Sequence, residues 1–113
     1  MFPKPNFKRT KRKRGNITTI TKAVNDEVMR RSEHLCERCG TGSAWAFERA
    51  HLIKASQGGR GDHPAYIVLL CGPSVNTGTC HNFADYTAAG RKWREEKHEE
   101  LKRFYTEELN WPL

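Results

Sequence analysis

Hydrophobic side chains recur with helical spacing in three parts of this chain. Near the amino end, two valines lie four residues apart behind Thr21, a residue type that often caps helices, so we expect a helix within residues 17–34. A short helix is expected over residues 80–89, where Gly90 would end it, because glycine commonly follows the last turn. Residues 91–109 carry apolar side chains at helical intervals among many charges, which predicts a longer helix with a solvated face.

Between these helices the pattern changes to the two-residue alternation of extended chain. Over residues 44–53 the side chains of Trp45 and Phe47 alternate with small or polar residues, which predicts a strand with one aromatic face. Residues 66–70 are apolar throughout, which predicts a second, buried strand. The glycine-rich stretch between the two favours a loop, so we expect an antiparallel ribbon within an α+β fold.

Four cysteines bracket the predicted ribbon, and their positions favour a metal site. Cys36 and Cys39 form a CxxC turn, Cys71 follows the second strand, and Cys80 opens the short helix. Two such corners brought together hold zinc through four thiolates, with Zn–S distances near ~2.3 Å. A chain of 113 residues with 36% hydrophobic residues builds one small core, which usually needs a staple. We therefore expect a structural Zn²⁺ ion in a single domain over residues 17–113.

Two disulfides are the alternative use of the four cysteines. The first residues of the chain lack the apolar segment of a signal peptide, so we expect a reducing compartment, where thiols bind metals more often than they oxidise. No apolar run approaches the ~18 residues of a membrane span, so we expect no membrane partner. Both observations favour zinc over disulfides.

The positive charge of the chain is concentrated at its amino end. The formal net charge is +7; residues 1–15 contain seven of the 20 Lys and Arg residues and no acid, and the other 13 balance the 13 acidic residues. We expect residues 1–16 to form a flexible, disordered basic arm that binds nucleic acid through counterion release. A solubilising or targeting tail is the alternative. The predicted contacts of the arm are Lys8, Arg9, Lys11, Arg12, Lys13 and Arg14.

Three further residues carry candidate chemistry. His51 lies near the end of the first predicted strand, and His81 and Asp85 are four residues apart, so both face one side of the short helix. A ββα arrangement would place His51 across from this pair. A neutral histidine with a pKa near ~6.5 is a suitable general base, and a His–carboxylate pair is a two-ligand platform for Mg²⁺, Mn²⁺, Ni²⁺ or Zn²⁺. A single histidine on a strand, or a His–Asp pair on a helix, is more often structural than catalytic. The order of the cysteines, His51 and the His81–Asp85 pair along the chain is a more specific pattern.

The order of these motifs resembles the HNH endonuclease family, in particular its small zinc-containing phage and prophage members. The resemblance implies a ββα-metal core in which His51 is the general base, His81 and Asp85 bind a catalytic divalent metal, and the four cysteines bind structural zinc. It also implies hydrolysis of DNA, as a nick or a double-strand break, in the cytoplasm of a bacterial host, with a phage terminase or another phage protein as candidate partner. The matching segments are Cys36-x-x-Cys39-Gly40, His51 with Ser56-Gln57-Gly58-Gly59, Leu69-Leu70-Cys71-Gly72, and Thr79-Cys80-His81 with Asp85.

Two positions depart from the family pattern. Ala50 stands where the family usually has a His or Asp that also binds the metal, and Tyr66 stands where it usually has an Asn that orients the base. The first change removes a ligand, and the second removes a hydrogen bond of the kind that sets the tautomer of a histidine. Candidates to replace the missing ligand are Asp62, His63 and Glu48.

Three functions follow from these observations. The first is a metal-dependent HNH-type DNA endonuclease, in which Arg49, Lys54 and Arg60 are candidate phosphate contacts. The second is a degenerate module of the same fold that binds DNA or a phage protein without cutting, which the two departures favour. The third is a zinc-knuckle protein that binds RNA or the ribosome and does not depend on His51.

Overall fold

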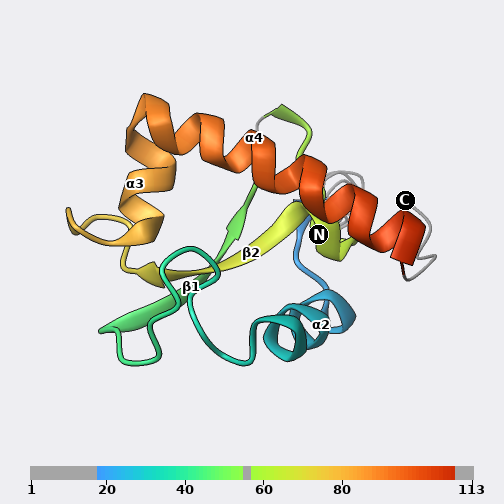
Figure 1. Cartoon of the computed structure of the whole chain (residues 1–113), viewed down its shortest axis with the longest axis horizontal. Helices are drawn as coiled ribbons and strands as arrows, with labels where there is room; N and C mark the ends of the chain where they lie inside the picture. Colours follow the sequence, from blue (N-terminus) through green and yellow to red (C-terminus); the bar gives the residue numbers. More distant parts are fainter. Residues whose placement is uncertain (1–17, 55–56, 109–113) are drawn as a thin grey trace, which may run out of the picture.

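The computed structural model describes residues 18–54 and 57–108, and the predicted arm of residues 1–16 lies outside this range. A two-stranded antiparallel ribbon of β1 (Ala46–His51) and β2 (Ile67–Gly72) occupies the centre, with helices on both sides of it (Figure 1). The register pairs Ala46 with Gly72 and His51 with Ile67. The structure is thus a small α+β fold, as the hydrophobic pattern predicts.

Strand β2 is buried along its whole length because helices cover both of its faces. Val68 and Leu70 point into a core cluster that includes residues of the carboxyl-terminal helices. Ile67 and Leu69 alternate with them and pack against the helix α2 (Lys22–Ser32) on the other face. A strand covered on both faces reads as a continuous apolar run, which explains why residues 66–70 lack alternation. A short 3-10 turn (Pro64–Tyr66) leads into the strand.

Helix α2 confirms the predicted cap but is shorter than the segment in which it was expected. The Oγ1 atom of Thr21 accepts a hydrogen bond from the backbone N–H of Val24 at 3.2 Å, which satisfies one free donor of the first turn. The helix ends at Glu33, whose backbone is left-handed with φ 58°. Val24 and Val28 are buried against β2, as their spacing predicts.

A partly buried ion pair, which was not identified from the sequence, connects α2 to the ribbon. The Arg31 guanidinium contacts the Glu37 carboxylate at 2.7 Å and also donates to the carbonyl oxygen of Ile67 at 2.7 Å. Glu37 in turn accepts a hydrogen bond from the backbone N–H of Leu69 at 2.8 Å. The pair therefore holds the chain just after Cys36 against β2, next to the first cysteine corner.

The predicted aromatic face of the first strand is wrong. The strand starts at Ala46, which pairs with the last residue of β2, so Trp45 lies beyond the end of the ribbon and its side chain is 89% exposed. Phe47 does pack, and it contacts both core clusters. The alternation of aromatic residues thus continues past the point at which strand pairing begins.

The prediction that Gly90 ends the short helix is also wrong. Helix α3 (Cys80–Tyr86) ends earlier, and Thr87 is both its last cap and the N-cap of α4 (Ala88–Arg103). Gly90 lies in the first turn of α4, where a Cβ atom would overlap the carbonyl oxygen of Phe83. The glycine is therefore needed for the close approach of the two helices, not for a helix end.

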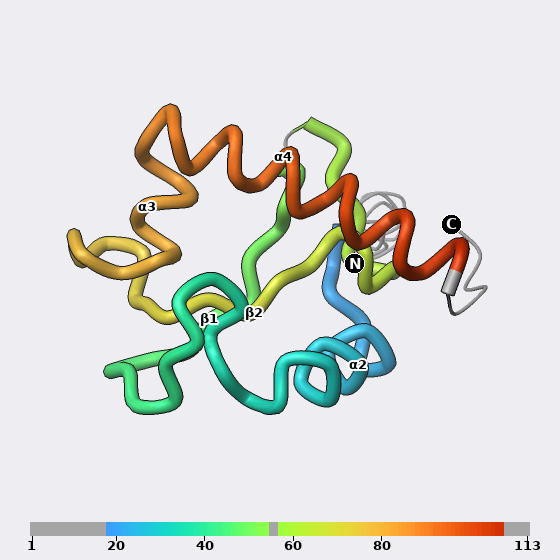
Figure 2. The backbone as a smooth tube through the Cα atoms, viewed as in Figure 1, coloured from blue at the N-terminus to red at the C-terminus, as the bar shows by residue number. Residues whose placement is uncertain are grey.

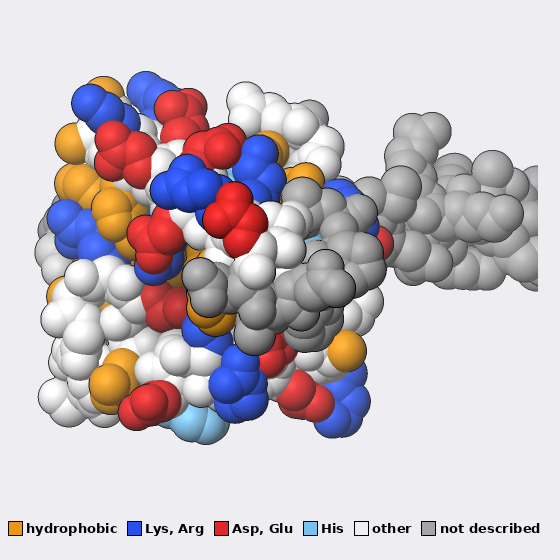
Figure 3. All heavy atoms as spheres, turned by 45° about the vertical axis from the view of Figure 1, so that its right-hand side comes forward, with side chains coloured by type: hydrophobic (Ala, Val, Ile, Leu, Met, Phe, Trp, Pro, Cys, Tyr) orange, Lys and Arg blue, Asp and Glu red, His pale blue; other side chains and the backbone are white. Residues whose placement is uncertain are grey.

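Helix α4 presents a charged face to solvent, as predicted, and continues into a π-helical turn (Phe104–Glu108). Leu101 and Tyr105 are buried in the core, as their spacing predicts, whereas Phe104 is 36% exposed. Acidic and basic side chains are interspersed over the face of the molecule shown in Figure 3. None of the helices within residues 18–54 and 57–108 combines the length and the apolar character that a bilayer crossing requires.

Candidate functional site

The four cysteines converge into one cluster, and their geometry fits a tetrahedral metal. Their Sγ atoms all lie within 4.8 Å of one another, and the Sγ atoms of Cys39 and Cys71 are 3.9 Å apart. Four thiolates at ~2.3 Å from a zinc ion place neighbouring sulfur atoms about 3.8 Å apart. All four cysteines are free thiols. The arrangement therefore suits a structural metal such as zinc rather than two disulfides.

Three separate parts of the fold bring these thiols together. The CxxC turn precedes β1, and Gly40 allows its tight return with a φ of +80°. Cys71 lies at the end of β2, and Cys80 opens α3, where Thr79 caps the helix. In Figure 2 the teal loop that carries the CxxC turn lies beside the yellow end of β2, in agreement with the sulfur distances.

Hydrogen bonds from N–H groups and burial act in opposite directions on the pKa values of the cluster thiols. The Cys36 Sγ atom accepts from the backbone N–H groups of Arg38 and Cys39, and the Cys71 Sγ atom accepts from that of Cys80. Burial alone raises the pKa of Cys36, but these N–H groups lower it to about 7. Burial raises the pKa of Cys71, and it raises that of Cys80 to about 12 even though the Arg38 guanidinium donates to its sulfur. Metal binding must therefore displace protons from Cys71 and Cys80 near neutral pH.

The predicted general base and the two predicted metal ligands line one hollow. An open hollow of about 270 Å³ is lined by His51 from the end of β1 and by His81 and Asp85 from α3. Arg49 and Lys54, both predicted phosphate contacts, line it as well, together with Ala50. The structure thus brings a histidine, a His–Asp pair and two cations to the same space, although they span 37 positions of the chain from Arg49 to Asp85.

A backbone carbonyl group orients His51. The Nε2 atom of His51 lies 2.8 Å from the carbonyl oxygen of Thr18. A carbonyl can only accept, so Nε2 is the donor, and in the neutral ring Nδ1 is then the nitrogen with the free lone pair. From the sequence, Tyr66 in place of an Asn was expected to leave His51 less well oriented. The contact with Thr18 supplies the orienting hydrogen bond from another part of the chain.

Two carboxylates hold His81 on opposite sides of its ring. The Nδ1 atom lies 2.6 Å from Oε1 of Glu48, and the Nε2 atom lies 3.3 Å from Oδ2 of Asp85. Glu48 is fixed by the backbone N–H of Ser74 at 3.1 Å, and its carboxylate packs closely over Gly72, where any side chain would collide with it. Glu48 therefore supports the ring of His81 from behind and does not replace the ligand missing at Ala50.

The His81–Asp85 pair fits two neighbouring ligands of a divalent metal. Ligand atoms at ~2.1 Å from an octahedral metal lie about 3.0 Å apart, close to the 3.3 Å between Nε2 and Oδ2. A carboxylate on the other ring nitrogen is the usual support of a metal-binding histidine. Within the described residues, however, the four cysteines are the sole cluster of three or more potential ligands, so this pair supplies two ligands by itself.

The other residues considered for this site lie elsewhere. Asp62 forms an ion pair with Arg60 at 2.8 Å, and the Arg60 guanidinium lies over the Tyr66 ring. His63 is buried and accepts a hydrogen bond from the backbone N–H of Ala65. Neither Asp62 nor His63 lines the hollow, and Arg60 does not reach it either. These positions therefore do not replace the ligand missing at Ala50.

One further charged residue beside this site, Arg94, was not among the residues singled out from the sequence. Its side chain is 4% exposed and reaches from α4 to the segment that follows β1. Arg94 follows apolar Trp93 and precedes two glutamates in a charged run, which gave no signal of burial.

No family model matches this chain, and no curated protein or solved structure matches it, so the assignment of the site depends on its geometry.

Proposed function

We propose that this protein is a metal-dependent HNH-type endonuclease that hydrolyses phosphodiester bonds of DNA. The observation that carries the proposal is the shared hollow, whose lining includes His51, the His81–Asp85 pair and two cations. General base, metal ligands and phosphate contacts are the groups that phosphodiester hydrolysis requires. The concentration of positive charge in the first 15 residues supports a nucleic-acid substrate.

Each residue of the hollow has a distinct part in this mechanism. Arg49 and Lys54 bind the phosphate and bring the scissile bond to the hollow, since both line it. His51 takes the proton of the attacking water at Nδ1, while Thr18 holds the proton on Nε2. His81 and Asp85 would hold the divalent metal, and Glu48 would keep the Nε2 atom of His81 directed at it. A metal bound there would polarise the phosphate and stabilise the leaving oxygen.

A second candidate function is a binding module of the same fold that does not cut DNA. Ala50 lines the hollow without offering a ligand atom, so the metal platform has two protein ligands where the family usually has a third. A weaker platform favours nucleic-acid binding without hydrolysis. The RNA-binding alternative has no separate support from the described residues, because the basic arm on which it depends lies outside them.

Nicking of supercoiled plasmid separates these functions. The full chain is incubated with Mg²⁺, Mn²⁺ or Ni²⁺, and the same assay is run on His51→Asn, which removes the basic nitrogen. The matched control is His34→Asn, because His34 is exposed, lies outside the hollow and has a left-handed backbone (φ 65°) that asparagine tolerates. We expect a loss of nicking of at least about 100-fold in His51→Asn and none in the control, since a general base contributes about 10²–10⁴-fold.

Two other outcomes would count against the endonuclease. Plasmid binding without nicking under any of the metals would support the binding module. Equal nicking by His34→Asn and His51→Asn would also count against the endonuclease: loss in both would show a folding defect, and retention in both would show that a contaminating nuclease or another group does the cutting.

A further inference from the structure

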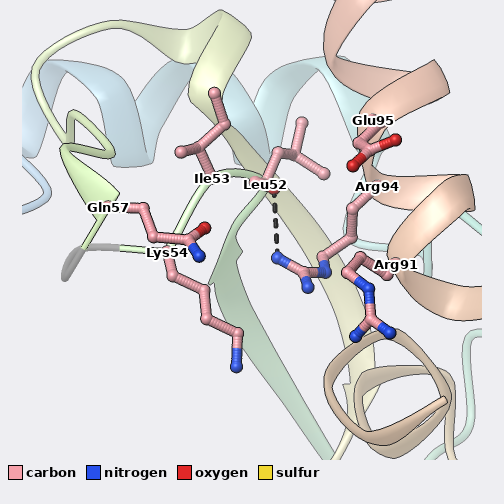
Figure 4. A pocket seen from close by; sticks show the side chains of 7 residues that line it. All are labelled: Leu52, Ile53, Lys54, Gln57, Arg91, Arg94 and Glu95. Atoms are coloured by element: carbon pink, nitrogen blue, oxygen red, sulfur yellow. Dashed lines mark hydrogen bonds between the residues drawn. The ribbon is translucent and has the colours of Figure 1, made fainter. Parts of the chain in front are cut away.

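A second hollow, of about 530 Å³, lies between the segment that follows β1 and the first half of α4 (Figure 4). Arg91 and Arg94 project from α4 on one side of it, and Lys54 and Gln57 approach from the other side. Glu95 lies on the α4 side of the same view. Three cations and one acid thus line this space, which leaves an excess of positive charge.

Arg94 is the anchored cation of this hollow. Its Nε atom donates to the carbonyl oxygen of Ala84 at 2.9 Å, and its Nη1 atom donates to that of Leu52 at 3.2 Å. The side chain is 4% exposed, so its guanidinium is held in a fixed orientation. Two carbonyl dipoles use two of its five N–H groups but do not neutralise its charge. A buried charge of this kind is costly unless an anion accompanies it.

The cations of the second hollow lack the acidic partners that lysines farther along α4 have. Lys97 pairs with Glu100 at 3.2 Å, and Lys102 pairs with Glu99 at 3.0 Å. Within residues 18–54 and 57–108, no ion pair involves Lys54, Arg91 or Arg94. The two lysines farther along α4 are thus paired with acids, whereas the cations of the second hollow are not.

Lys54 connects this hollow to the one that contains His51 and His81, because its side chain lines both. We propose that the second hollow, formed by Lys54, Arg91 and Arg94, binds a phosphate group of the nucleic-acid backbone. On the proposed function, this phosphate neighbours the one that is hydrolysed. The planar fork of an anchored arginine suits the oxygens of a phosphate, and Lys54 and Arg91 add charge from two sides.

Binding of a short fluorescein-labelled DNA duplex to the full chain tests this site. The measurement is made without added divalent metal, so that no strand is cut, and at several salt concentrations. The variants are Lys54→Gln and Arg91→Gln, both at exposed positions. The matched control is Lys92→Gln, which changes the charge equally at the next position of α4 but does not line the hollow.

We expect each hollow variant to weaken duplex binding several-fold and to lower the slope of log Kd against log salt concentration by about one, since one phosphate contact is lost. Lys92→Gln should keep the wild-type affinity and slope. Because Lys54 also lines the hollow of His51, Arg91→Gln decides the second hollow: the phosphate site is overturned if Arg91→Gln behaves like Lys92→Gln. Because this readout needs no cleavage, it decides the site even where plasmid nicking fails.

The role of Arg94 is tested in the unmodified chain, without a substitution. A substitution would also remove its hydrogen bonds to Ala84 and Leu52. The nuclear magnetic resonance signal of its Nε–H group should shift when the duplex is added. Inorganic phosphate, compared with chloride at equal ionic strength, distinguishes the source of the phosphate. A shift with inorganic phosphate and none with the duplex would overturn the backbone assignment, and no shift with either would overturn the site.

Discussion

The cysteine cluster and the histidine hollow adjoin each other but are built in different ways. In the cluster, four side chains of one kind converge on one point, and three of the four cysteines are buried. In the hollow, side chains of different kinds face an open space, and each histidine is held by a partner from elsewhere: Thr18 for His51, Glu48 for His81. The cluster suits a permanent structural ion, whereas the hollow remains open to solvent and to a substrate.

The two regions meet at the first turn of α3. Cys80 belongs to the cluster and His81, the next residue, belongs to the hollow. A metal held by Cys80 therefore fixes the start of the helix that carries His81 and Asp85. We expect loss of the cluster to disturb both regions, and loss of a hollow residue to leave the cluster intact.

The largest expected effect is that of Cys36→Ser. The zinc binding free energy of about 10–16 kcal/mol in four-ligand sites is comparable to or exceeds the total stability of about 5–15 kcal/mol of a small domain. Loss of one thiolate should therefore abolish both the cooperative thermal transition and the binding of one zinc ion per chain. The control Ser43→Ala, in the same loop, should change neither. Circular dichroism and metal analysis measure both. An unchanged melting temperature in Cys36→Ser would show that the cluster does not stabilise the fold.

A chelator titration of the wild-type chain sharpens the same contrast. A mild chelator should stop nicking without changing the melting temperature, because the His81–Asp85 pair offers two ligands and the cluster four. Removal of zinc from the thiolates should then unfold the domain. A single step, with activity and folding lost together, would mean that one metal serves both regions.

A smaller effect is expected from Glu48→Gln, which keeps the shape of the side chain and removes its charge. Loss of a carboxylate behind a metal-binding histidine commonly lowers metal affinity about 10- to 100-fold. Mn²⁺ titration followed by electron paramagnetic resonance measures this directly, with melting temperature and nicking as parallel readouts. Glu96→Gln, at an exposed position of α4, is the matched control. Equal Mn²⁺ affinity in the two variants would show that Glu48 does not support a metal at His81.

The smallest expected effect is a coupling between zinc and protons at the cluster. Because burial raises the pKa of Cys71, and raises that of Cys80 to about 12, both thiols are protonated near pH 7 without metal. Zinc binding should then release at least two protons, and zinc occupancy should fall as the pH is lowered, since protons compete for the sulfur atoms. Calorimetry in buffers of different ionisation enthalpy measures the release. An enthalpy that does not depend on the buffer would show that zinc displaces no protons, and so that the thiols are not its ligands.

Local sequence determined much of the scaffold. Thr21 and the two valines behind it placed α2, and the unbroken apolar run placed a strand that is covered on both faces. The CxxC turn is a local unit, so it predicted a cysteine corner before any tertiary contact was known. These features depend on backbone conformation and burial pattern within a few residues, which is why the order of residues alone reveals them.

Tertiary packing decided the rest. Gly90 has the sequence signature of a helix end, yet it serves the close contact of α4 with Phe83, and Trp45 falls outside the ribbon because its register starts one residue later. Thr18 lies 33 positions from His51 and Glu48 lies 33 positions from His81, so no local pattern could pair them. Arg94 is buried because α4 passes over the end of β1. Residue types and their order revealed which groups could do chemistry, but only the folded chain determined which partner holds each group, since hydrogen bonds between distant segments form only after the segments have packed together.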